Sequence, residues 1–391
     1  AVALLEGFDI QSMGVAAPFV RQEFGLTKGE LAWVFSAATL GMFPGAVLGG
    51  RAADRFGRKK VLLINVFLFG VMSLLTAFCT DFTSFVVVRF LTGLGMGAAL
   101  PLMITIASEA VPAKYNGMAV SVMYSGIPIG AAVTALMASA FDNGAEQWKQ
   151  IFYLGGIAPI VILPVLMLFL RDSQQFWQAQ QTHGQTSKPK FREVLFAGKR
   201  AAATWQVWIS FFCTLVVLYF ILNWLPFLMR ENGLQNQEVM YIQLAYQIGA
   251  AIGTLILGRL LDKANLKWVV CAIYGGILSG LTALALSSSF AFLALAAAWC
   301  GVFLTGGQSA LYALAALVYP SQMRGTGVGV AVAAGRIGSF AGPLLAGMIL
   351  AVSSDSSAVI GASVPVIALA ALAALLLVKQ LNRLKEQGGE A

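Results

Sequence analysis

The chain of 391 residues is 59% hydrophobic and only 11% charged, whereas ordinary soluble domains carry about 25% charged residues. Its mean hydropathy of +0.80 excludes an ordinary soluble protein and predicts a polytopic membrane protein. The net charge of +8 could point to nucleic acid, but the placement of the basic residues excludes that partner, as shown below.

Twelve apolar segments long enough to cross a bilayer follow one another, since a span needs about 20 mostly apolar residues. All are predicted to be helices, because open sheets and loops cannot face lipid. The first span begins at residue 1, so we expect that a short preceding segment is missing, and no cleavable signal peptide is visible. The predicted spans cover residues 1–20, 31–50, 61–79, 84–108, 117–141, 151–170, 203–226, 237–260, 268–287, 290–316, 325–351 and 359–378.

The positions of the basic residues predict the topology. With the amino terminus placed inside, 19 of the 25 Lys and Arg fall on cytoplasmic segments, and two, Arg89 and Arg336, lie within spans. This asymmetry predicts a multi-pass protein of a bacterial inner membrane with both termini in the cytoplasm. The positive charge is therefore a topology signal, and no nucleic-acid partner is predicted. The four basic residues expected outside are Arg21, Lys28, Lys149 and Arg230.

The chain divides into two similar halves. We predict a first six-helix bundle over 1–170, a cytoplasmic linker over the polar stretch 171–202, and a second bundle with a short cytoplasmic tail over 203–391. A single offset of 208 residues relates several loop positions, which indicates a duplicated unit. The related pairs are Gly50 with Gly258, Asp54 with Asp262, Pro112 with Pro320, Gly117 with Gly325, and Gly130 with Gly338.

The segment "GGRAADRFGRKK" at 49–60 resembles the signature of the major facilitator superfamily. The resemblance implies an all-α membrane protein of 12 helices in two pseudo-symmetric six-helix bundles. In this sequence Gly50 is expected to let neighbouring helices approach closely, and Asp54 to pair with a basic residue or to lie near a helix N-terminus. The resemblance also implies a cytoplasmic gate, formed by Gly50, Asp54, Arg55, Gly57, Arg58, Asp262 and Arg324.

Further motifs resemble the aromatic acid:proton symporter family within that superfamily. They are "EGFDIQSMGVAAP" in the first span, "RFLTGLGMGAALP" at 89–101, "SEAVPAKYNG" at 108–117 and "YPSQMRGTGVGVAVAAGRIGSFAGP" at 319–343. The family usually has Asp where this chain has Glu6. "FSAATLGMFPGAVLGG" and "MYSGIPIGAA" are most similar to the branch that transports hydroxyphenylpropionates. The resemblance covers essentially the whole chain and implies a monomer that imports aromatic carboxylates with protons, without another cofactor.

Two acids in the first span are the predicted proton-coupling groups. Glu6 and Asp9 share one helical face at i, i+3. Asp9 lies about 12 residues, or about 18 Å, from the outer end of its span, which is near the middle of the bilayer. An ionisable group there marks a functional site, and two neighbouring acids titrate together. The alternative is a structural hydrogen bond between helices. Glu109, near the inner end of span four, is either a proton relay or a gate partner.

Arg336 is the predicted anchor of the substrate carboxylate, because it lies about 12 residues (about 18 Å) into span eleven, and arginine keeps its charge and binds carboxylates bidentately. The alternative is an ion pair with an acid of the protein, although spans seven to twelve contain no deep acid. Arg89, nearer the outer end of span four, either contributes to substrate binding and coupling or forms a static ion pair with Asp9 or Glu6.

Polar and aromatic residues in other spans are candidates for the rest of the cavity, because rings stack on an aromatic substrate and amides bind its hydroxyls. Packing is the alternative for each. A proton-coupled exporter of drugs or organic anions with the same fold is the alternative function, yet its Gly-Pro motif is matched only in part by "SGIPIGAA". We expect no enzyme, because no nucleophile–base constellation and no metal-ligand cluster is visible. The candidates for the lining of the cavity are Tyr124, Asn223, Trp224, Gln243, Gln247, Gln308 and Tyr312.

Overall fold

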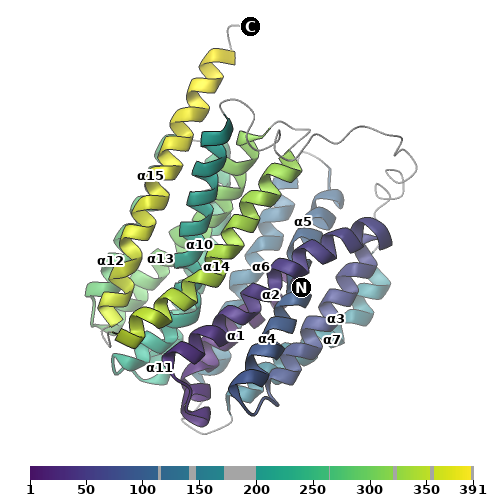
Figure 1. Ribbon diagram of the computed structural model, residues 1–391, viewed down its shortest axis with the longest axis vertical. Coiled ribbons are helices and arrows are strands. Elements are labelled where there is room, and N and C mark those ends of the chain that lie inside the picture. Colours follow the sequence, from purple (N-terminus) through teal and green to yellow (C-terminus); the bar gives the residue numbers. More distant parts are fainter. Residues whose placement is uncertain are drawn as a thin grey trace.

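The computed structural model describes residues 1–112, 116–140, 147–170, 200–263, 265–319, 324–352 and 356–388, and these ranges are helical without a strand (Figure 1). Eleven helical segments in these ranges are long and apolar enough to cross a membrane. The twelfth, α1 (Val2–Phe24), has 23 residues and is made more polar by its four charged residues. Within the described chain, the all-helical prediction is therefore confirmed.

Helix boundaries repeat between the halves. Five helices of the second half begin 208 residues after their counterparts, at 236 against 28, 266 against 58, 290 against 82, 324 against 116 and 356 against 148. The first half continues with α2 (Lys28–Phe56), α3 (Arg58–Thr76), α4 (Phe82–Gly97), α5 (Ala99–Glu109), α6 (Asn116–Ser139) and α7 (Trp148–Phe169). The second half contains α10 (Arg200–Glu231), α11 (Asn236–Lys263), α12 (Leu266–Leu286), α13 (Phe290–Val318), α14 (Arg324–Val352) and α15 (Ser356–Gly388).

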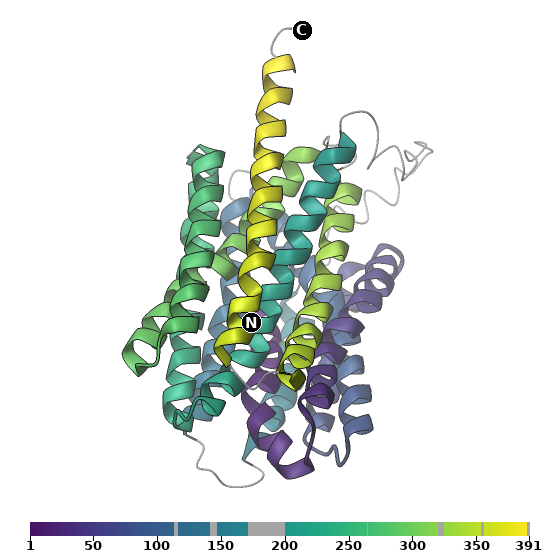
Figure 2. The same ribbon diagram turned by 60° about the vertical axis from the view of Figure 1, so that its left-hand side comes forward.

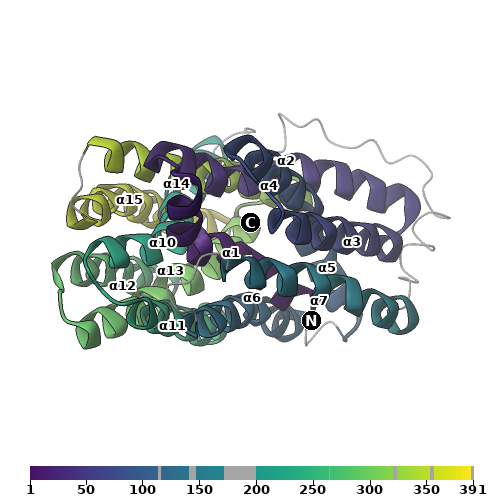
Figure 3. The ribbon, with the colours of Figure 1, turned by 90° about the horizontal axis from the view of Figure 1, so that it is seen from below.

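Helix pairing repeats as well. In the first bundle α2 packs on α4, α1 on α6 and α3 on α7, and the second bundle repeats this with α11 on α13, α10 on α14 and α12 on α15. The two bundles lie side by side (Figure 3). Contacts between them run mainly from α6 to α11, from α2 to α14 and from α1 to α10. A site between the bundles is therefore bordered mainly by these six helices.

Glycines set the closest helix contacts at equivalent places in both halves. A Cβ on Gly93 of α4 would collide with the backbone of Ala38 in α2, and one on Gly41 of α2 would collide with Phe90 in α4. At the positions 208 residues later, Gly249 and Gly301 meet the partner backbone in the same way. Small residues let helix backbones approach closely where no hydrophobic effect drives association.

The helices differ from the predicted spans in two places, a break within one span and an extension of another. The segment predicted as one span over 84–108 is divided into α4 and α5, because Pro101 has no N–H with which to bond the carbonyl four residues earlier and three glycines precede it. At the other end, α15 continues to Gly388 beyond the predicted end at residue 378, and it projects past the other helices (Figure 2). Residues 379–388 are polar but rich in helix formers, so the helix continues without an apolar environment. Most of the predicted linker, residues 171–199, lies outside the described residues.

Candidate functional site

Asp9 forms a fully buried ion pair with Arg89. Its two carboxylate oxygens accept from the Nη1 and Nη2 atoms of Arg89 at 3.2 and 3.0 Å, and the Ser73 hydroxyl donates to Oδ1 at 2.6 Å. The side chains of Asp9 and Arg89 are 0% and 2% exposed. The pair joins α1 to α4, while Ser73 comes from α3. Of the two predictions for Arg89, this conformation contains the ion pair, and a role of Arg89 in substrate binding stays a prediction.

A small cavity adjoins this ion pair. It has a volume of about 20 Å³ and reaches from Asp9 and Arg89 across to Tyr219 and Asn223 of α10. The other walls come from α1, α2 and α4. The ion pair therefore borders the interface between the two bundles.

Arg336 lies at a second polar centre between the bundles. Its Nη1 atom donates to the Tyr219 hydroxyl at 3.2 Å and contacts the Met42 sulfur of the opposite bundle at 3.4 Å. Glu6 of α1 interacts electrostatically with Arg336 and is 1% exposed, but no ion pair of 4 Å or less joins the two. The Oε2 atom of Glu6 has no hydrogen-bond partner. Glu6 and Asp9 thus face different arginines, although they are one helical turn apart.

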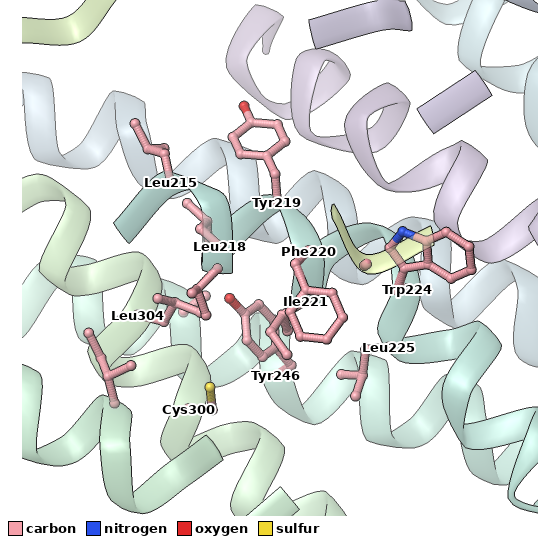
Figure 4. Close-up of a cluster of buried hydrophobic side chains, with 14 of the residues drawn as sticks. Leu215, Leu218, Tyr219, Phe220, Ile221, Trp224, Leu225, Tyr246, Cys300 and Leu304 are labelled. Carbon is pink, nitrogen blue, oxygen red and sulfur yellow. The ribbon is translucent and has the colours of Figure 1, made fainter. Parts of the chain in front are cut away.

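Three tyrosines surround Arg336, and the hydroxyls of all three interact electrostatically with its guanidinium. Tyr124 of α6 and Tyr312 of α13 have ring centroids 6.1 Å apart, and Tyr312 also packs on Phe211 at 5.3 Å. Tyr219 projects from α10 away from the apolar cluster around Leu218 and Leu304 (Figure 4). A guanidinium beside a tyrosine hydroxyl can pair with a carboxylate.

Sequence reasoning missed two residues of this region. Tyr219 lies one helical turn before Asn223, so both belong to the same face of α10, which was the available signal. Gln11 lies in the apolar first span two residues after Asp9, and it is fully buried. Its amide donates to the Leu222 carbonyl at 3.1 Å and accepts from Gln247 at 3.0 Å, so it joins α1 to α10 and α11.

The remaining cavity candidates differ in their surroundings. Asn223 lines the cavity and donates to the Tyr219 carbonyl at 2.7 Å. Gln243 is buried with both amide atoms unpartnered, and Gln308 is half-buried on α13 one turn before Tyr312. A substrate contact for Trp224 is wrong in this conformation. Its side chain is fully buried, its indole N–H donates to the Pro343 carbonyl at 3.1 Å, and its ring packs on Phe35 and Phe227, so it is a packing residue.

The predicted gate residues are described only in part. Gly57 has a φ of 95°, a conformation that favours glycine, where α2 ends and α3 begins. Arg55 lies over the ring of the neighbouring Phe56 at 5.2 Å, and Arg58 is half-buried at the start of α3. The expected close approach at Gly50 is wrong here, because a Cβ added there would meet no atom within 4 Å. The side chains of Asp54, Glu109, Asp262 and Arg324 lie outside the described residues.

Contacts between α2 and α14 join the two bundles. The Ser36 hydroxyl donates to the Phe340 carbonyl at 3.0 Å, and Gly347 lies against Ala32. Both contacts, and that of Met42 with Arg336, involve the half of α2 that is nearer the predicted outer end. Beyond them, towards the predicted cytoplasmic end, Gly50 has no close neighbour. The described contacts of Ala32 and Ser36 with α14 therefore lie towards the predicted outer end of α2.

Known proteins resemble this chain along its whole length. It is 46% identical over 384 residues to the 3-(3-hydroxy-phenyl)propionate transporter of Escherichia coli strain K12, covering 98% of this chain and 93% of the relative. It is 33% identical over 377 residues to the gallate transporter of Pseudomonas putida (89% and 83% covered). It is 32% identical over 380 residues to the 4-hydroxybenzoate transporter PcaK of Acinetobacter baylyi, with the same coverage.

Solved structures and a family model agree with these relatives. The partially occluded inward-open structure of the xylose transporter XylE from E. coli has a TM-score of 0.77 at 18% identity, covering 96% of this chain and 94% of that one. At this identity the likeness concerns the fold alone. The family model described as Major Facilitator Superfamily matches residues 1–235 and 207–390. The chain therefore belongs to the major facilitator superfamily, whose members are membrane transporters and not enzymes.

Proposed function

We propose that this chain imports aromatic carboxylic acids together with protons by alternating access. The observation that carries the proposal is the placement of Arg336 between the bundles, within reach of three tyrosines. A guanidinium in this position is a permanent positive charge that a carboxylate can pair with, and the tyrosine rings provide aromatic surface for the rest of the substrate.

The relatives support the substrate class. Their names give 3-(3-hydroxy-phenyl)propionate, gallate and 4-hydroxybenzoate as what they transport, and each is a carboxylic acid on a hydroxylated ring. We therefore propose a substrate of the hydroxyphenylpropionate, hydroxycinnamate or hydroxybenzoate type, taken up for aromatic catabolism. Amides near the interface, among them Asn223 and Gln247, are the proposed partners of ring hydroxyls.

Asp9 is the proposed proton carrier. It is the acid whose ionised form is held by Arg89 and Ser73, and protonation would remove one charge from this ion pair and release the guanidinium. Because the pair borders the cavity between the bundles, its state can change with the arrangement of the bundles. Glu6, near Arg336, is the second candidate, and Glu109 stays a proposed relay outside the described side chains.

Orientation and gating complete the proposal. The excess of basic residues on alternate loops supports an inner-membrane protein with both termini in the cytoplasm. In that orientation the α2–α14 contacts at Ala32 and Ser36 lie towards the external side, which supports an inward-facing state. In the outward-facing state, the cytoplasmic side would be closed by the predicted gate residues, namely Asp54, Arg55, Arg58, Asp262 and Arg324.

Uptake into proteoliposomes tests the function. Labelled 3-(3-hydroxyphenyl)propionate, 4-hydroxybenzoate, protocatechuate and a neutral aromatic amide would be offered under an acidic-outside pH gradient, with and without an ionophore. We expect gradient-dependent accumulation of acids and not of the amide. Accumulation of cationic amphiphiles under a gradient of opposite sense, without any uptake of acids, would identify an exporter and refute the proposal.

The Asp9→Asn variant separates coupling from transport. It keeps the shape of the side chain but cannot carry the proton, so we expect loss of gradient-driven accumulation while exchange of labelled for unlabelled acid continues. Ser73→Ala is the matched control, because it removes one hydrogen bond from Asp9 and keeps the titratable carboxylate. Full accumulation by Asp9→Asn would assign the proton to another group.

A further inference from the structure

Three of the four basic residues predicted outside gather at one point. Glu231, at the end of α10, pairs with Arg21 at 3.2 Å and with Lys28 at 3.5 Å, and Arg230 precedes it in the chain. Arg21 and Lys28 belong to the first bundle, so the cluster joins the two bundles at the predicted outer end. Outer segments of membrane proteins are generally poor in Lys and Arg, so this concentration calls for a specific role.

A cavity lies at the same place. It is open to solvent, has a volume of about 470 Å³ and is formed by the end of α1, the α1–α2 turn and the end of α10. Its walls combine two guanidiniums and one carboxylate with an aromatic ring and aliphatic side chains. The lining residues are Pro18, Arg21, Gln22, Gly25, Leu26, Phe227, Arg230 and Glu231.

We propose that this cavity is an external docking site for the aromatic carboxylate before it enters the central site. The inference rests on the proposed function for the class of ligand. A guanidinium binds a carboxylate through paired, charge-assisted hydrogen bonds, and Phe227, Leu26 and Pro18 offer apolar surface to the ring. Arg21 already lies over the ring of Phe227, with its guanidinium carbon 5.2 Å from the ring centroid.

Glu231 acts as an internal competitor in this site. Its carboxylate occupies Arg21 and Lys28 when no ligand is bound, and a substrate carboxylate offers the same chemistry. The side chains of Arg21 and Glu231 are 34% and 37% exposed, so an arriving anion can reach them from the solvent. Displacement of Glu231 would break the ion pairs between the bundles, so docking would favour opening of the outer side.

The same ion pairs could also serve purely as a latch, and the sign of the mutational effects separates the two roles. A latch is weakened equally by Arg21→Gln and Glu231→Gln, so both variants would shift the apparent KM in the same direction. A docking site loses a cation in Arg21→Gln and a competitor in Glu231→Gln, so the shifts are opposite. We expect Arg21→Gln to raise the external KM about two- to fivefold and Glu231→Gln to lower it by a similar factor. This size follows from the modest interaction energy of partly exposed charge pairs.

Initial rates of 3-(3-hydroxyphenyl)propionate uptake by intact cells would give KM and the saturated rate. Arg230→Gln removes the second guanidinium of the cavity and should raise KM like Arg21→Gln. The prediction can therefore still be tested if one of the two variants misfolds. Lys149→Gln is the matched control with the same charge change, because Lys149 pairs with Glu23 inside the first bundle at 3.7 Å and does not line the cavity.

Ionic strength adds an independent readout. In proteoliposomes, the KM difference between wild type and Arg21→Gln should shrink as ionic strength rises from about 0.01 to about 0.1 M, since the Debye length falls from about 30 to about 10 Å. Shifts of equal sign for Arg21→Gln and Glu231→Gln, with wild-type import intact, would overturn the docking site and leave the proposed function standing. Absence of aromatic-acid import by the wild type would overturn both.

Discussion

Replacing Asp9 by Asn should be costly for stability as well as for coupling. Arg89 is 2% exposed, and its charge is balanced by Asp9 through two hydrogen bonds of 3.2 and 3.0 Å. Removing one member of a buried ion pair leaves an uncompensated buried charge, which costs about 3–5 kcal/mol. The Nε atom of Arg89 already lacks a partner, so the guanidinium has little alternative bonding. We therefore expect Asp9→Asn to lower the free energy of unfolding by about 3 kcal/mol.

A double-mutant cycle with Arg89→Gln measures the pair itself. The double variant removes both charges and leaves two neutral amides, so it should be more stable than Asp9→Asn alone, with a coupling energy of about 1–3 kcal/mol. Accumulation driven by the pH gradient should stay absent in the double variant, because neither residue can carry the proton. Unfolding of the purified protein in detergent gives the stabilities, and proteoliposome assays separate accumulation from exchange.

Additive effects of the two substitutions would refute this reasoning about the ion pair. Accumulation by the double variant at the wild-type level would refute the assignment of the proton to Asp9, whatever the stabilities. Ser73→Ala again serves as the control. It should cost only about 1 kcal/mol, the usual contribution of one hydrogen bond, and should leave accumulation intact.

Four further substitutions test the site and the fold. Arg336→Gln should raise the KM for carboxylates about tenfold or more, since a hydrogen bond to a charged group contributes about 1.5–3 kcal/mol, as measured by uptake kinetics. Gly93→Ala should lower the free energy of unfolding by about 1–3 kcal/mol, because the added Cβ clashes with Ala38. Gly50→Ala is the control and should leave the free energy of unfolding unchanged, because its Cβ would meet no atom within 4 Å. Trp224→Phe should lower stability and leave the KM unchanged, because its ring packs away from the substrate.

The repeat was predictable from sequence because it depends on local signals. Turn residues and apolar run lengths mark where helices begin, so the offset of 208 seen in loops reappears in the helix starts. Glycines at 41 and 93 and their counterparts at 249 and 301 likewise mark close helix contacts in both halves. Such features need no knowledge of how the helices rotate about their axes.

The partners of buried charges were harder to predict, because they depend on that rotation and on the packing of other helices. Glu6 and Asp9 share a helical face, yet Asp9 meets Arg89 and Glu6 lies near Arg336. Trp224 and Asn223 are neighbours in the chain, but only Asn223 lines the cavity. Gly50 has the sequence of a contact residue, yet a Cβ added there would meet no described atom within 4 Å.

The buried charges also bear on stoichiometry. Among the residues that the structure describes, Glu6, Asp9, Arg89 and Arg336 are the charged groups in the middle of the bundles, and with both acids ionised they sum to zero. A monocarboxylate that binds Arg336 adds one negative charge. An uncompensated charge in this interior is costly, so one proton on one of the two acids restores neutrality.

This balance predicts electroneutral symport of one proton with each monocarboxylate. Accumulation in proteoliposomes should follow the imposed pH gradient and be insensitive to a membrane potential set with potassium and valinomycin. Wild-type accumulation that increases with an inside-negative potential would mean that more than one proton enters, and the neutrality of these four residues would then not set the stoichiometry.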